Sequence, residues 1–281
     1  MALVTGCSSG IGEATTLALA AAGFRVFATA RNVADMEPLR KRAVSSGLPI
    51  ELRHLDVLDL KSIDDVMTEI ERDWRRLDVV VNNAGYCLLG AIEDIPSSSL
   101  RMQFDVNVHG LVAVYRAAMP VMRRSGGGAV VNISSVAGRV SVPLLGAYCA
   151  TKFSVEALSN AMRAEAHQFG VRVVSIEPGP VNTRFTQNAL KASSNIIRRS
   201  DSPYSRAYQK LREMYESDFG EGVQAERVAR VILRAVRSRR PRARYTVRAR
   251  DRLLVLAGGL TTTRVGQRFL RDYFWLSPEK R

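Results

Sequence analysis

Short apolar runs alternate with longer segments of helical apolar spacing from residue 2 to residue 177. The apolar runs predict six strands: Ala2–Thr5, Arg25–Ala30, Ile50–Leu55, Leu77–Asn82, Ala129–Ser134 and Val171–Glu177. The segments between them predict helices over residues 10–22, 35–46, 60–75, 97–124 and 147–169. Because the strands are apolar on both faces, helices should cover both sides of the sheet. The alternation therefore predicts an α/β fold with a doubly wound parallel sheet.

Beyond Gly179 the alternation gives way to segments of a different composition. Residues 184–222 include a tyrosine-rich helical stretch, residues 223–238 predict a helix, Arg244–Val247 a short strand, and residues 251–276 a basic amphipathic segment. The glycine run at residues 125–128 separates a helix from a strand and does not link two domains. We therefore expect a single domain with an elaborated C-terminal end.

Composition and charge argue against a disulfide-framed secreted protein and against a membrane-spanning one. Three cysteines in 281 residues are too few for a disulfide-framed secreted scaffold. The N-terminus runs straight into a strand, and no apolar run approaches the ~18 residues of a membrane span, so we expect a soluble cytoplasmic protein without a signal peptide. Residues 184–281 carry 23 basic and 9 acidic side chains, which accounts for the whole net charge of +14. The C-terminal third alone is basic.

A glycine-rich turn joins the first predicted strand to the first predicted helix. Its residues Gly6, Ser8, Ser9, Gly10, Ile11 and Gly12 fall in the pattern G-x-x-x-G-x-G. Glycines let backbone N–H groups approach a pyrophosphate, and the positive end of the helix dipole favours the anion. The same glycines would also serve a turn needed only for packing. Its place between strand and helix favours a dinucleotide phosphate loop.

Arg31 follows the second predicted strand, 19 residues after Gly12. A guanidinium there suits the 2′-phosphate of NADP(H), whereas NAD(H) usually meets a carboxylate at this point. A solvated arginine is the alternative, and Asp35 lies nearby in the sequence. We therefore expect NADP(H) as the cofactor, with NAD(H) less favoured.

Polar residues also follow the third and fourth strands. Asp56, beside Val57, is placed to accept from an adenine amino group, or else to cap the next helix. Asn82 is followed by Asn83, Ala84 and Gly85, which we expect beside the cofactor. Paired asparagines at a buried strand end require hydrogen-bond partners.

Tyr148 and Lys152 lie four residues apart, on one face of a predicted helix. A nearby ammonium favours the phenolate and lowers the pKa of a tyrosine, so Tyr148 is a candidate proton donor to a carbonyl that receives hydride. Ser135, 13 residues earlier, is placed to hold the substrate oxygen. Asn107 stands inside a predicted helix, where asparagine is unfavourable unless its amide is bonded, and we expect a backbone carbonyl or a water leading to Lys152.

Together these residues resemble the short-chain dehydrogenase/reductase family, in its non-extended group. The matching positions are Thr5-Gly6-x-x-x-Gly10-Ile11-Gly12, Asp56, Asn82-Asn83-Ala84-Gly85, Asn107, Ser135, Tyr148-x-x-x-Lys152 and Pro178-Gly179-x-x-x-Thr183. The resemblance implies a Rossmann-type fold and NAD(P)-dependent interconversion of alcohols and carbonyls. Tyr148 is then the acid/base, Ser135 orients the substrate oxygen, Lys152 binds the nicotinamide ribose, and Asn107 supports a proton relay.

The resemblance implies further features of the site and its assembly. Pro178, Gly179, Val181 and Thr183 would line the nicotinamide. Homodimers or homotetramers are usual, with an interface on the helices around Asn107 and Tyr148. The glycine loop, the strand before Arg31 and the residues around Tyr148 are similar to the 17β-hydroxysteroid and retinol dehydrogenase branch, which prefers NADP(H) when that arginine is present.

On this reading, the cofactor-binding and catalytic core is residues 1–183, the substrate lid 184–222 and the basic C-terminal helices 223–281. Val142, Leu144 and Leu145, with residues 86–89, should form an apolar wall around the substrate. We expect an apolar alcohol and its ketone or aldehyde; steroid, retinoid, fatty and xenobiotic carbonyls all remain open. A noncatalytic NADP(H)-sensing or interaction protein on the same fold is the alternative.

The cysteines and the C-terminal arginines indicate no further catalytic or metal-binding function. The spacing of Cys7, Cys87 and Cys149 matches no zinc site, and we expect no metal. The arginines of residues 250–275 accompany no nucleic-acid-binding module, so we expect no nucleic acid partner. This segment should pack over the pocket or a neighbouring subunit, and peripheral contact with an anionic membrane is the less favoured alternative.

Overall fold

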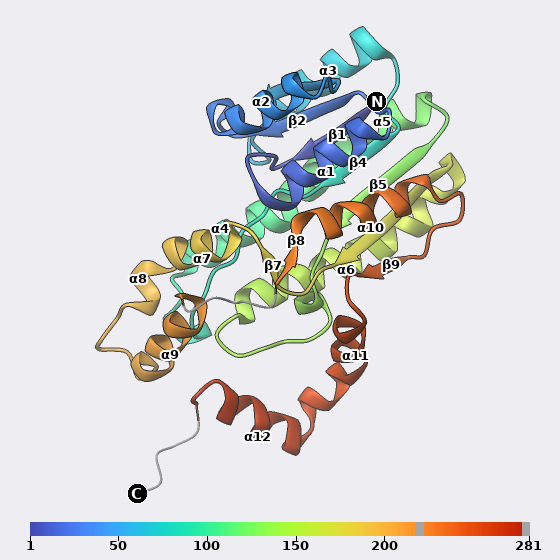
Figure 1. The fold of residues 1–281 in the computed structure, drawn as a ribbon. Helices are drawn as coiled ribbons and strands as arrows, with labels where there is room; N and C mark the ends of the chain where they lie inside the picture. Colours follow the sequence, from blue (N-terminus) through green and yellow to red (C-terminus); the bar gives the residue numbers. More distant parts are fainter. Residues whose placement is uncertain (217–221, 277–281) are drawn as a thin grey trace, which may run out of the picture.

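A seven-stranded parallel sheet forms the centre of the protein. The computed structural model describes residues 1–216 and 222–276 (Figure 1). The sheet has the order β3-β2-β1-β4-β5-β6-β9. Its strands are β1 (Ala2–Thr5), β2 (Val26–Ala30), β3 (Ile50–His54), β4 (Val79–Asn82), β5 (Gly128–Ile133), β6 (Val171–Glu177) and β9 (Arg244–Thr246). The predicted doubly wound α/β fold, in a single domain, is confirmed.

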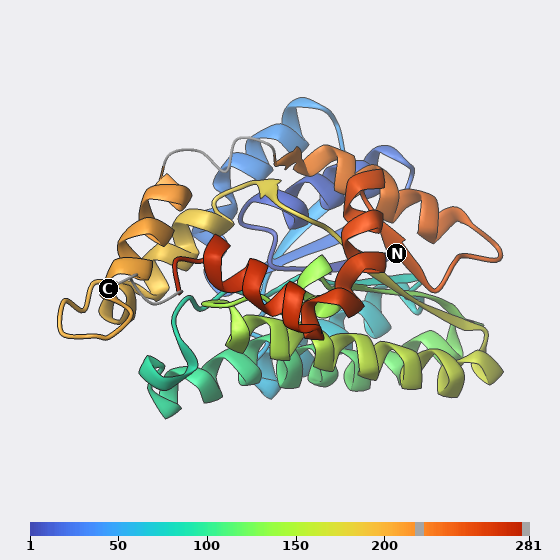
Figure 2. The ribbon, with the colours of Figure 1, turned by 90° about the horizontal axis from the view of Figure 1, so that it is seen from below.

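Two layers of helices cover the sheet (Figure 2). One apolar core lies under α1 (Gly10–Ala21), α2 (Glu37–Ser45) and α10 (Ala225–Arg237). The other lies under α3 (Leu60–Trp74), α5 (Gly110–Arg124) and α6 (Gly146–Ala166). The central strands β1, β4 and β5 are buried on both faces, which explains why their sequences are apolar throughout.

The predicted helix over residues 97–124 is continuous but not uniform. It consists of α4 (Ser97–Phe104), a π-helical turn (Asp105–His109) and α5. A π turn widens the helix by one residue, and such turns occur mostly at functional sites. Here it contains Asn107, one of the candidate site residues.

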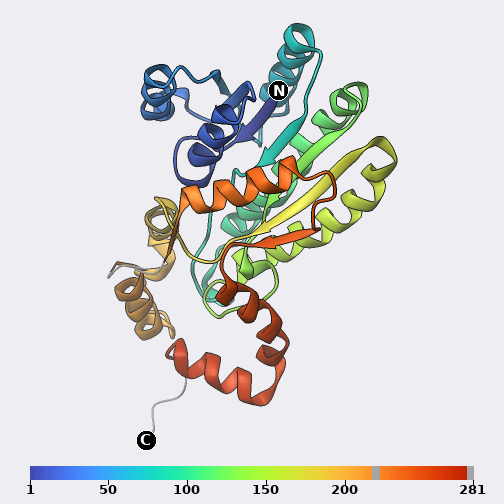
Figure 3. The same ribbon diagram turned by 45° about the vertical axis from the view of Figure 1, so that its right-hand side comes forward.

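Parts of the C-terminal third form a layer over the carboxyl ends of the strands, whereas α10 and β9 belong to the body. The lid helices lie between two short strands that pair in parallel, β7 (Val181–Asn182) and β8 (Val223–Gln224), and the two last helices form an arm that reaches back toward the lid (Figure 3). The lid helices are α7 (Phe185–Ala192), α8 (Ser194–Ile197) and α9 (Ser205–Glu216), and the arm is α11 (Ala249–Ala257) and α12 (Arg264–Tyr273).

A third apolar cluster lies beneath the lid and the arm. It joins Leu89, Tyr148, Leu211, Leu270 and Phe274. One face of α12, in the basic C-terminal segment, therefore packs on the apolar cluster that contains Tyr148. Within the part of the chain that the structure describes, no helix is both long and apolar enough to cross a membrane.

Candidate active site

The glycine-rich turn lies at the point where the strand order reverses, between β1 and β4. Gly6 has φ +70°, and a Cβ on Gly12 would lie 2.3 Å from the Gly6 carbonyl oxygen. Both glycines are therefore required by the turn itself. Ser9, at the start of α1, makes no side-chain cap hydrogen bond. The N–H groups of the first turn of α1 therefore face outward uncapped, as a helix that receives a pyrophosphate requires.

The two asparagines after β4 hold the loop and the sheet together. Asn83 donates from Nδ2 to the carbonyls of Thr5 (2.9 Å) and Gly6 (3.0 Å). Asn82 donates to Asn132 Oδ1 across the sheet at 2.9 Å. The predicted need for partners is met for the Nδ2 donors of both side chains, whereas Asn82 Oδ1 is buried without a hydrogen-bond partner.

Arg31 lies exposed just beyond β2, at the edge where an adenosine ribose would lie. Its backbone carbonyl lies 2.9 Å from Nδ1 of His54 at the end of β3. The nearby carboxylate of Asp35 accepts from Asn32 at 3.1 Å. The group available to a ribose substituent at this edge is therefore a cation, which fits a 2′-phosphate.

Asp56 belongs to the loop after β3, and its alternative interpretation as a helix cap is wrong. Its Oδ1 accepts from the backbone N–H of Leu58 at 3.0 Å, whereas Asp59 caps α3 by accepting from Lys61. The reason is that the chain makes one more turn before the helix begins. Val57 is buried beside Asp56.

Tyr148, Ser135 and Lys152 meet at the carboxyl end of β5, as their spacing predicts. Ser135 follows β5, and its hydroxyl lies near enough to Tyr148 to favour the phenolate. The same hydroxyl donates to the Pro178 carbonyl at 3.3 Å. Lys152 Nζ donates to the Ile133 carbonyl at 2.8 Å and lies 5.6 Å from the centre of the Tyr148 ring.

Burial controls the protonation of both residues of this pair. It raises the pKa of Tyr148 above its ordinary value, the neighbouring Cys87 adds to this, and the nearby Ser135 hydroxyl opposes it. Burial also lowers the pKa of Lys152 to about 8. Desolvation of the phenol therefore dominates in the protein by itself, and the lowering of the Tyr148 pKa by Lys152 together with an oxidised nicotinamide stays a prediction.

Both polar atoms of the Asn107 side chain form hydrogen bonds with neighbouring groups. Its Oδ1 accepts from the Tyr86 N–H at 3.0 Å, and its Nδ2 donates to the Tyr86 carbonyl at 2.8 Å and to Thr151 Oγ1 at 3.1 Å. A Cβ on Gly85 would lie 3.0 Å from Asn107 Oδ1 and 4.0 Å from Lys152 Nζ. Gly85 therefore keeps the approach between Asn107 and Lys152 open, as a relay through a small molecule such as water would need.

The segment after β6 crosses from the phosphate loop to the catalytic phenol. A Cβ on Gly10 would lie 2.8 Å from Thr183 Cγ2. Arg184 donates from Nη2 to the Ser8 carbonyl at 2.6 Å, and the Phe185 ring centre lies 5.9 Å from that of Tyr148. We call residues 183–185 the strap. The sequence did not predict a role for Arg184, because a single arginine outside any motif gives no indication of a distant hydrogen-bond partner.

Of the other residues predicted to line the nicotinamide after β6, some lie beside the catalytic residues and some pack against neighbouring elements. Pro178 offers its carbonyl to Ser135, and Val181 lies partly buried at the start of β7. A Cβ on Gly179 would lie 2.5 Å from Asp251 Oδ1. Gly179 therefore also permits α11 to pack closely.

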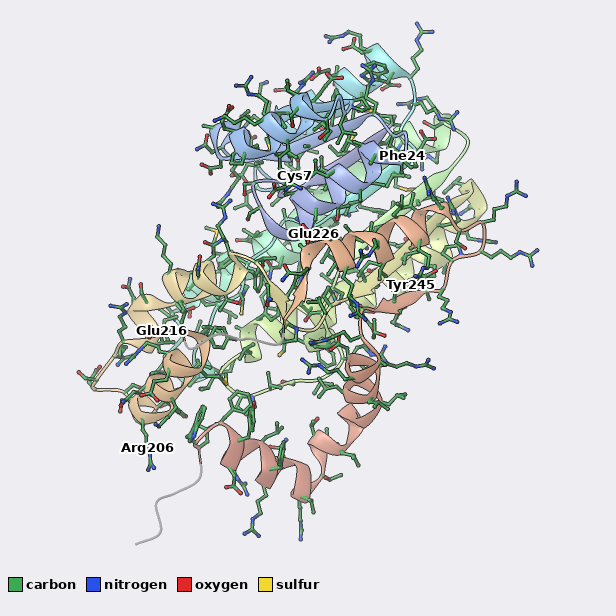
Figure 4. All side chains as sticks on the ribbon, in the orientation of Figure 1. Cys7, Phe24, Arg206, Glu216, Glu226 and Tyr245 are labelled. Atoms are coloured by element: carbon green, nitrogen blue, oxygen red, sulfur yellow. The ribbon has the colours of Figure 1, made fainter. Side chains whose placement is uncertain are left out.

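The predicted substrate wall is apolar. Leu144 is buried, and Val142 and Leu145 pack partly buried against the cluster that contains Tyr148. Tyr215, at the end of α9 in the predicted lid region 184–222, also packs against this cluster. Burial and the nearby Cys87 raise the pKa of its phenol. The cluster thus combines aliphatic side chains with several tyrosines besides Tyr148. Figure 4 labels Glu216, the last residue of α9, which directly follows Tyr215.

The cysteines lie buried and free around the site. Burial raises the pKa of Cys7 to about 12. The same cause raises the pKa of Cys87 and of Cys149, so none of the three is a ready nucleophile. Over residues 1–216 and 222–276, no group of three or more His, Cys, Asp or Glu side chains could hold a metal ion.

Comparisons with known proteins agree with this geometry. The family described as short chain dehydrogenase matches residues 1–194. The chain is 36% identical over 251 residues to human 17-beta-hydroxysteroid dehydrogenase type 1, covering 86% of this chain and 76% of that protein. It is 32% identical over 255 residues to a probable short-chain type dehydrogenase/reductase, VdlC, of Helicobacter pylori, covering 91% and 90%.

A solved structure extends the likeness to the C-terminal layer. The crystal structure of a short-chain dehydrogenase from Streptomyces avermitilis matches with a TM-score of 0.78 and 29% identity. The match covers 99% of this chain and 97% of that one.

Proposed function

The chain belongs to the short-chain dehydrogenase/reductase family, and on that premise we propose that it is an NADP(H)-dependent enzyme for an apolar alcohol and its ketone or aldehyde. The family activity is NAD(P)-dependent oxidoreduction of alcohols and carbonyls. The preference for NADP(H) and the apolar substrate are the proposal. The catalytic activity itself is supported mainly by the position of Ser135, Tyr148 and Lys152, which meet at one end of the sheet with Asn107 beside Lys152.

Each of these side chains has a distinct task in the reaction. The nicotinamide, when bound, donates or accepts the hydride. Ser135 hydrogen-bonds the substrate oxygen, and Tyr148 gives that oxygen a proton in reduction and removes it in oxidation. The raised pKa of Tyr148 keeps the phenol protonated at neutral pH, so it is ready to act as the acid. The ammonium of Lys152, 5.6 Å from the ring centre, then stabilises the phenolate that forms.

The proposal of an NADP(H) preference rests on Arg31. Its guanidinium is exposed at the end of β2, while Asp35 is bonded to Asn32. We expect a higher kcat/KM with NADPH than with NADH, and Arg31→Ala should reduce that ratio about tenfold, as loss of a charged phosphate contact would. Arg40→Ala is the matched control, because Arg40 is exposed and bound to Glu37 on α2. An equal or better kcat/KM with NADH would overturn the preference.

An apolar substrate is supported by the cluster beneath the lid. Leu144, Leu145 and Val142 adjoin Tyr148, and the likeness to a 17-beta-hydroxysteroid dehydrogenase makes steroids the first class to test. Oxidation of NADPH should be measured with steroid, retinoid, aliphatic and aromatic carbonyls. A preference for small, strongly polar carbonyls would contradict the proposal.

Replacement of Tyr148 tests the chemistry directly. Tyr148→Phe should abolish turnover while its Kd for NADPH stays within about twofold, because the phenol supplies a proton and little cofactor affinity. Tyr115→Phe is the control, since Tyr115 is a partly buried residue of α5 that packs against a different apolar cluster from the one that contains Tyr148. Retained turnover in Tyr148→Phe would refute the role. NADPH binding without turnover by the unchanged protein on every carbonyl would favour the sensing alternative.

We also propose a homodimer or homotetramer assembled through α4, α5 and α6. Phe153 and Phe169, on and just after α6, and Met102 on α4 are large apolar side chains left exposed. Light scattering coupled to gel filtration should give a multiple of 31.0 kDa. Phe153→Ser should lower that mass, and a monomeric unchanged protein would refute the proposal.

A further inference from the structure

The outer surface of the C-terminal arm carries a concentration of exposed apolar side chains. Seven of the sixteen exposed large apolar residues in the described part of the chain lie between residues 253 and 273. Each is more than half exposed: Leu253, Leu254, Leu256, Leu260, Val265, Phe269 and Tyr273. Scattered single apolar residues are normal on a protein surface, whereas a contiguous group marks an interaction site.

The two faces of α12 are occupied differently. Leu270 and Phe274 point inward and join the apolar cluster that contains Tyr148. Val265, Phe269 and Tyr273 follow at intervals of four residues and form an outer stripe, 80%, 65% and 53% exposed. The rings of Phe269 and Tyr273 stack with centres 5.9 Å apart. The inner face thus fixes the helix to the body, while the outer stripe faces away from it.

Arginines accompany this stripe. Arg264, Arg268 and Arg271 are exposed on α12, and Arg252 is exposed on α11. Residues 249–276 contain five arginines and two aspartates, and one of these, Asp251, is buried and paired with Arg248. The surface of the arm is therefore both apolar and cationic. Helices of this composition lie at the boundary between lipid headgroups and acyl chains.

We propose that the outer surface of α11 and α12 docks on a membrane that contains anionic lipid, lying along the interface without crossing it. The charge favours a lipid surface over a second copy of the chain, because a two-fold contact would bring the same arginines together. The arm extends away from the sheet on the side of the lid, which leaves its outer surface accessible to a flat partner (Figures 1 and 3).

Docking there would bring the substrate cluster close to the lipid. The same helix presents Phe269 outward and Leu270 and Phe274 to the cluster around Tyr148. An apolar substrate dissolved in the bilayer would then have a short path to the pocket. Membrane binding itself does not depend on the proposed function, since neither the stripe nor the arginines touch the catalytic residues.

Vesicle flotation of the full chain tests the proposal. The unchanged protein should float with phosphatidylcholine vesicles containing phosphatidylserine, and more weakly with phosphatidylcholine alone or at high salt. Val265→Ser combined with Phe269→Ser should reduce binding to both vesicles at least tenfold. Arg264→Gln combined with Arg268→Gln should remove about fivefold per arginine, and only with the anionic vesicles.

The controls separate docking from misfolding and from self-association. Val44→Ser on α2 changes an equally exposed apolar residue, 74% exposed, and should leave flotation unchanged. Unaltered thermal unfolding and an unaltered Kd for NADPH show that the α12 variants are folded. The proposal is overturned if the unchanged protein does not float, if the Val265/Phe269 variant floats equally well, or if that variant instead halves the molecular mass in solution.

Discussion

Arg184 at the start of the lid donates a 2.6 Å hydrogen bond to the carbonyl of Ser8 in the phosphate loop, across 176 residues of sequence. Thr183 packs against Gly10 on one side, and Phe185 reaches the ring of Tyr148 on the other. The strap therefore joins the phosphate loop, the lid and the catalytic phenol. A change at the strap should affect cofactor binding and the packing of the lid against Tyr148 together.

Removal of the Arg184 side chain should weaken cofactor binding. We expect Arg184→Ala to raise the Kd for NADPH three- to tenfold, since one charge-assisted but exposed hydrogen bond contributes about 1 kcal/mol. Fluorescence titration of the bound nicotinamide measures the effect. Arg198→Ala, an exposed arginine just beyond α8, should leave the Kd unchanged. Equal Kd values for the two variants would show that the strap does not support the cofactor site.

Asn107 is predicted to be a positioning residue for Lys152. Asn107→Ala removes two hydrogen bonds to the backbone of Tyr86 and should cost about 2 kcal/mol of stability. It should also lower kcat more than tenfold and shift its pH profile, because Asn107 adjoins the approach to Lys152. A purely structural role would lower stability alone.

Gln103→Ala provides the matched comparison for Asn107. Gln103 donates to the same Tyr86 carbonyl at 2.9 Å. The Gln103→Ala variant should reduce the free energy of unfolding about as much as Asn107→Ala does, and it should leave kcat within about twofold of the unchanged protein. If both variants lose kcat equally, the position of the Tyr86 backbone, and not the amide of Asn107, supports the reaction.

The buried Lys152 should make stability depend on pH. Its pKa is lowered from 10.5 to about 8, so between these values the unfolded chain holds more protons and the free energy of unfolding rises with pH. Urea unfolding at pH 7 and pH 10 should therefore show a gain in the unchanged protein that Lys152→Met lacks, by about 2–3 kcal/mol. A gap between the two proteins that stays constant over this range would contradict the lowered pKa.

Tyr208 fastens the lid to the loop before α4. Its hydroxyl donates to Asp94 Oδ2 at 2.6 Å and accepts from the Ala91 N–H at 3.0 Å. Tyr208→Phe should reduce the free energy of unfolding by about 1–3 kcal/mol, because it leaves the buried Ala91 N–H without its partner and removes one of the hydrogen bonds to Asp94. It should raise the KM for the carbonyl more than it lowers kcat, since Tyr208 makes no hydrogen bond to the catalytic residues.

Tyr204→Phe is the control for Tyr208→Phe, because it removes a hydroxyl from the same region without removing a buried hydrogen bond. Tyr204 also lies in the lid region, but its hydroxyl donates to the exposed Glu93 at 2.9 Å. A solvated hydrogen bond of this kind contributes little, so stability and KM should change only slightly. A KM that rises as much in Tyr204→Phe as in Tyr208→Phe would contradict the special role of the buried bond.

The order of strands and helices along the chain, and the residues that meet at the carboxyl end of β5, could be predicted from the sequence alone. Strands buried on both faces leave uninterrupted apolar runs, which is why Ala2–Thr5 and Val171–Glu177 have the predicted bounds. Tyr148 and Lys152 lie one helical turn apart, so local geometry already brings them together. The glycine loop was evident because its constraints act within a few residues.

Only the tertiary structure decided the contacts and environments that depend on distant segments. The bond from Arg184 to Ser8 has no local signal, and the direction of the Tyr148 pKa shift depends on how far the lid and arm exclude water. Likewise, the stripe Val265, Phe269 and Tyr273 has the same spacing whether a neighbour covers it or not. Periodicity specifies a helix and its faces, whereas burial depends on what the rest of the chain places against them.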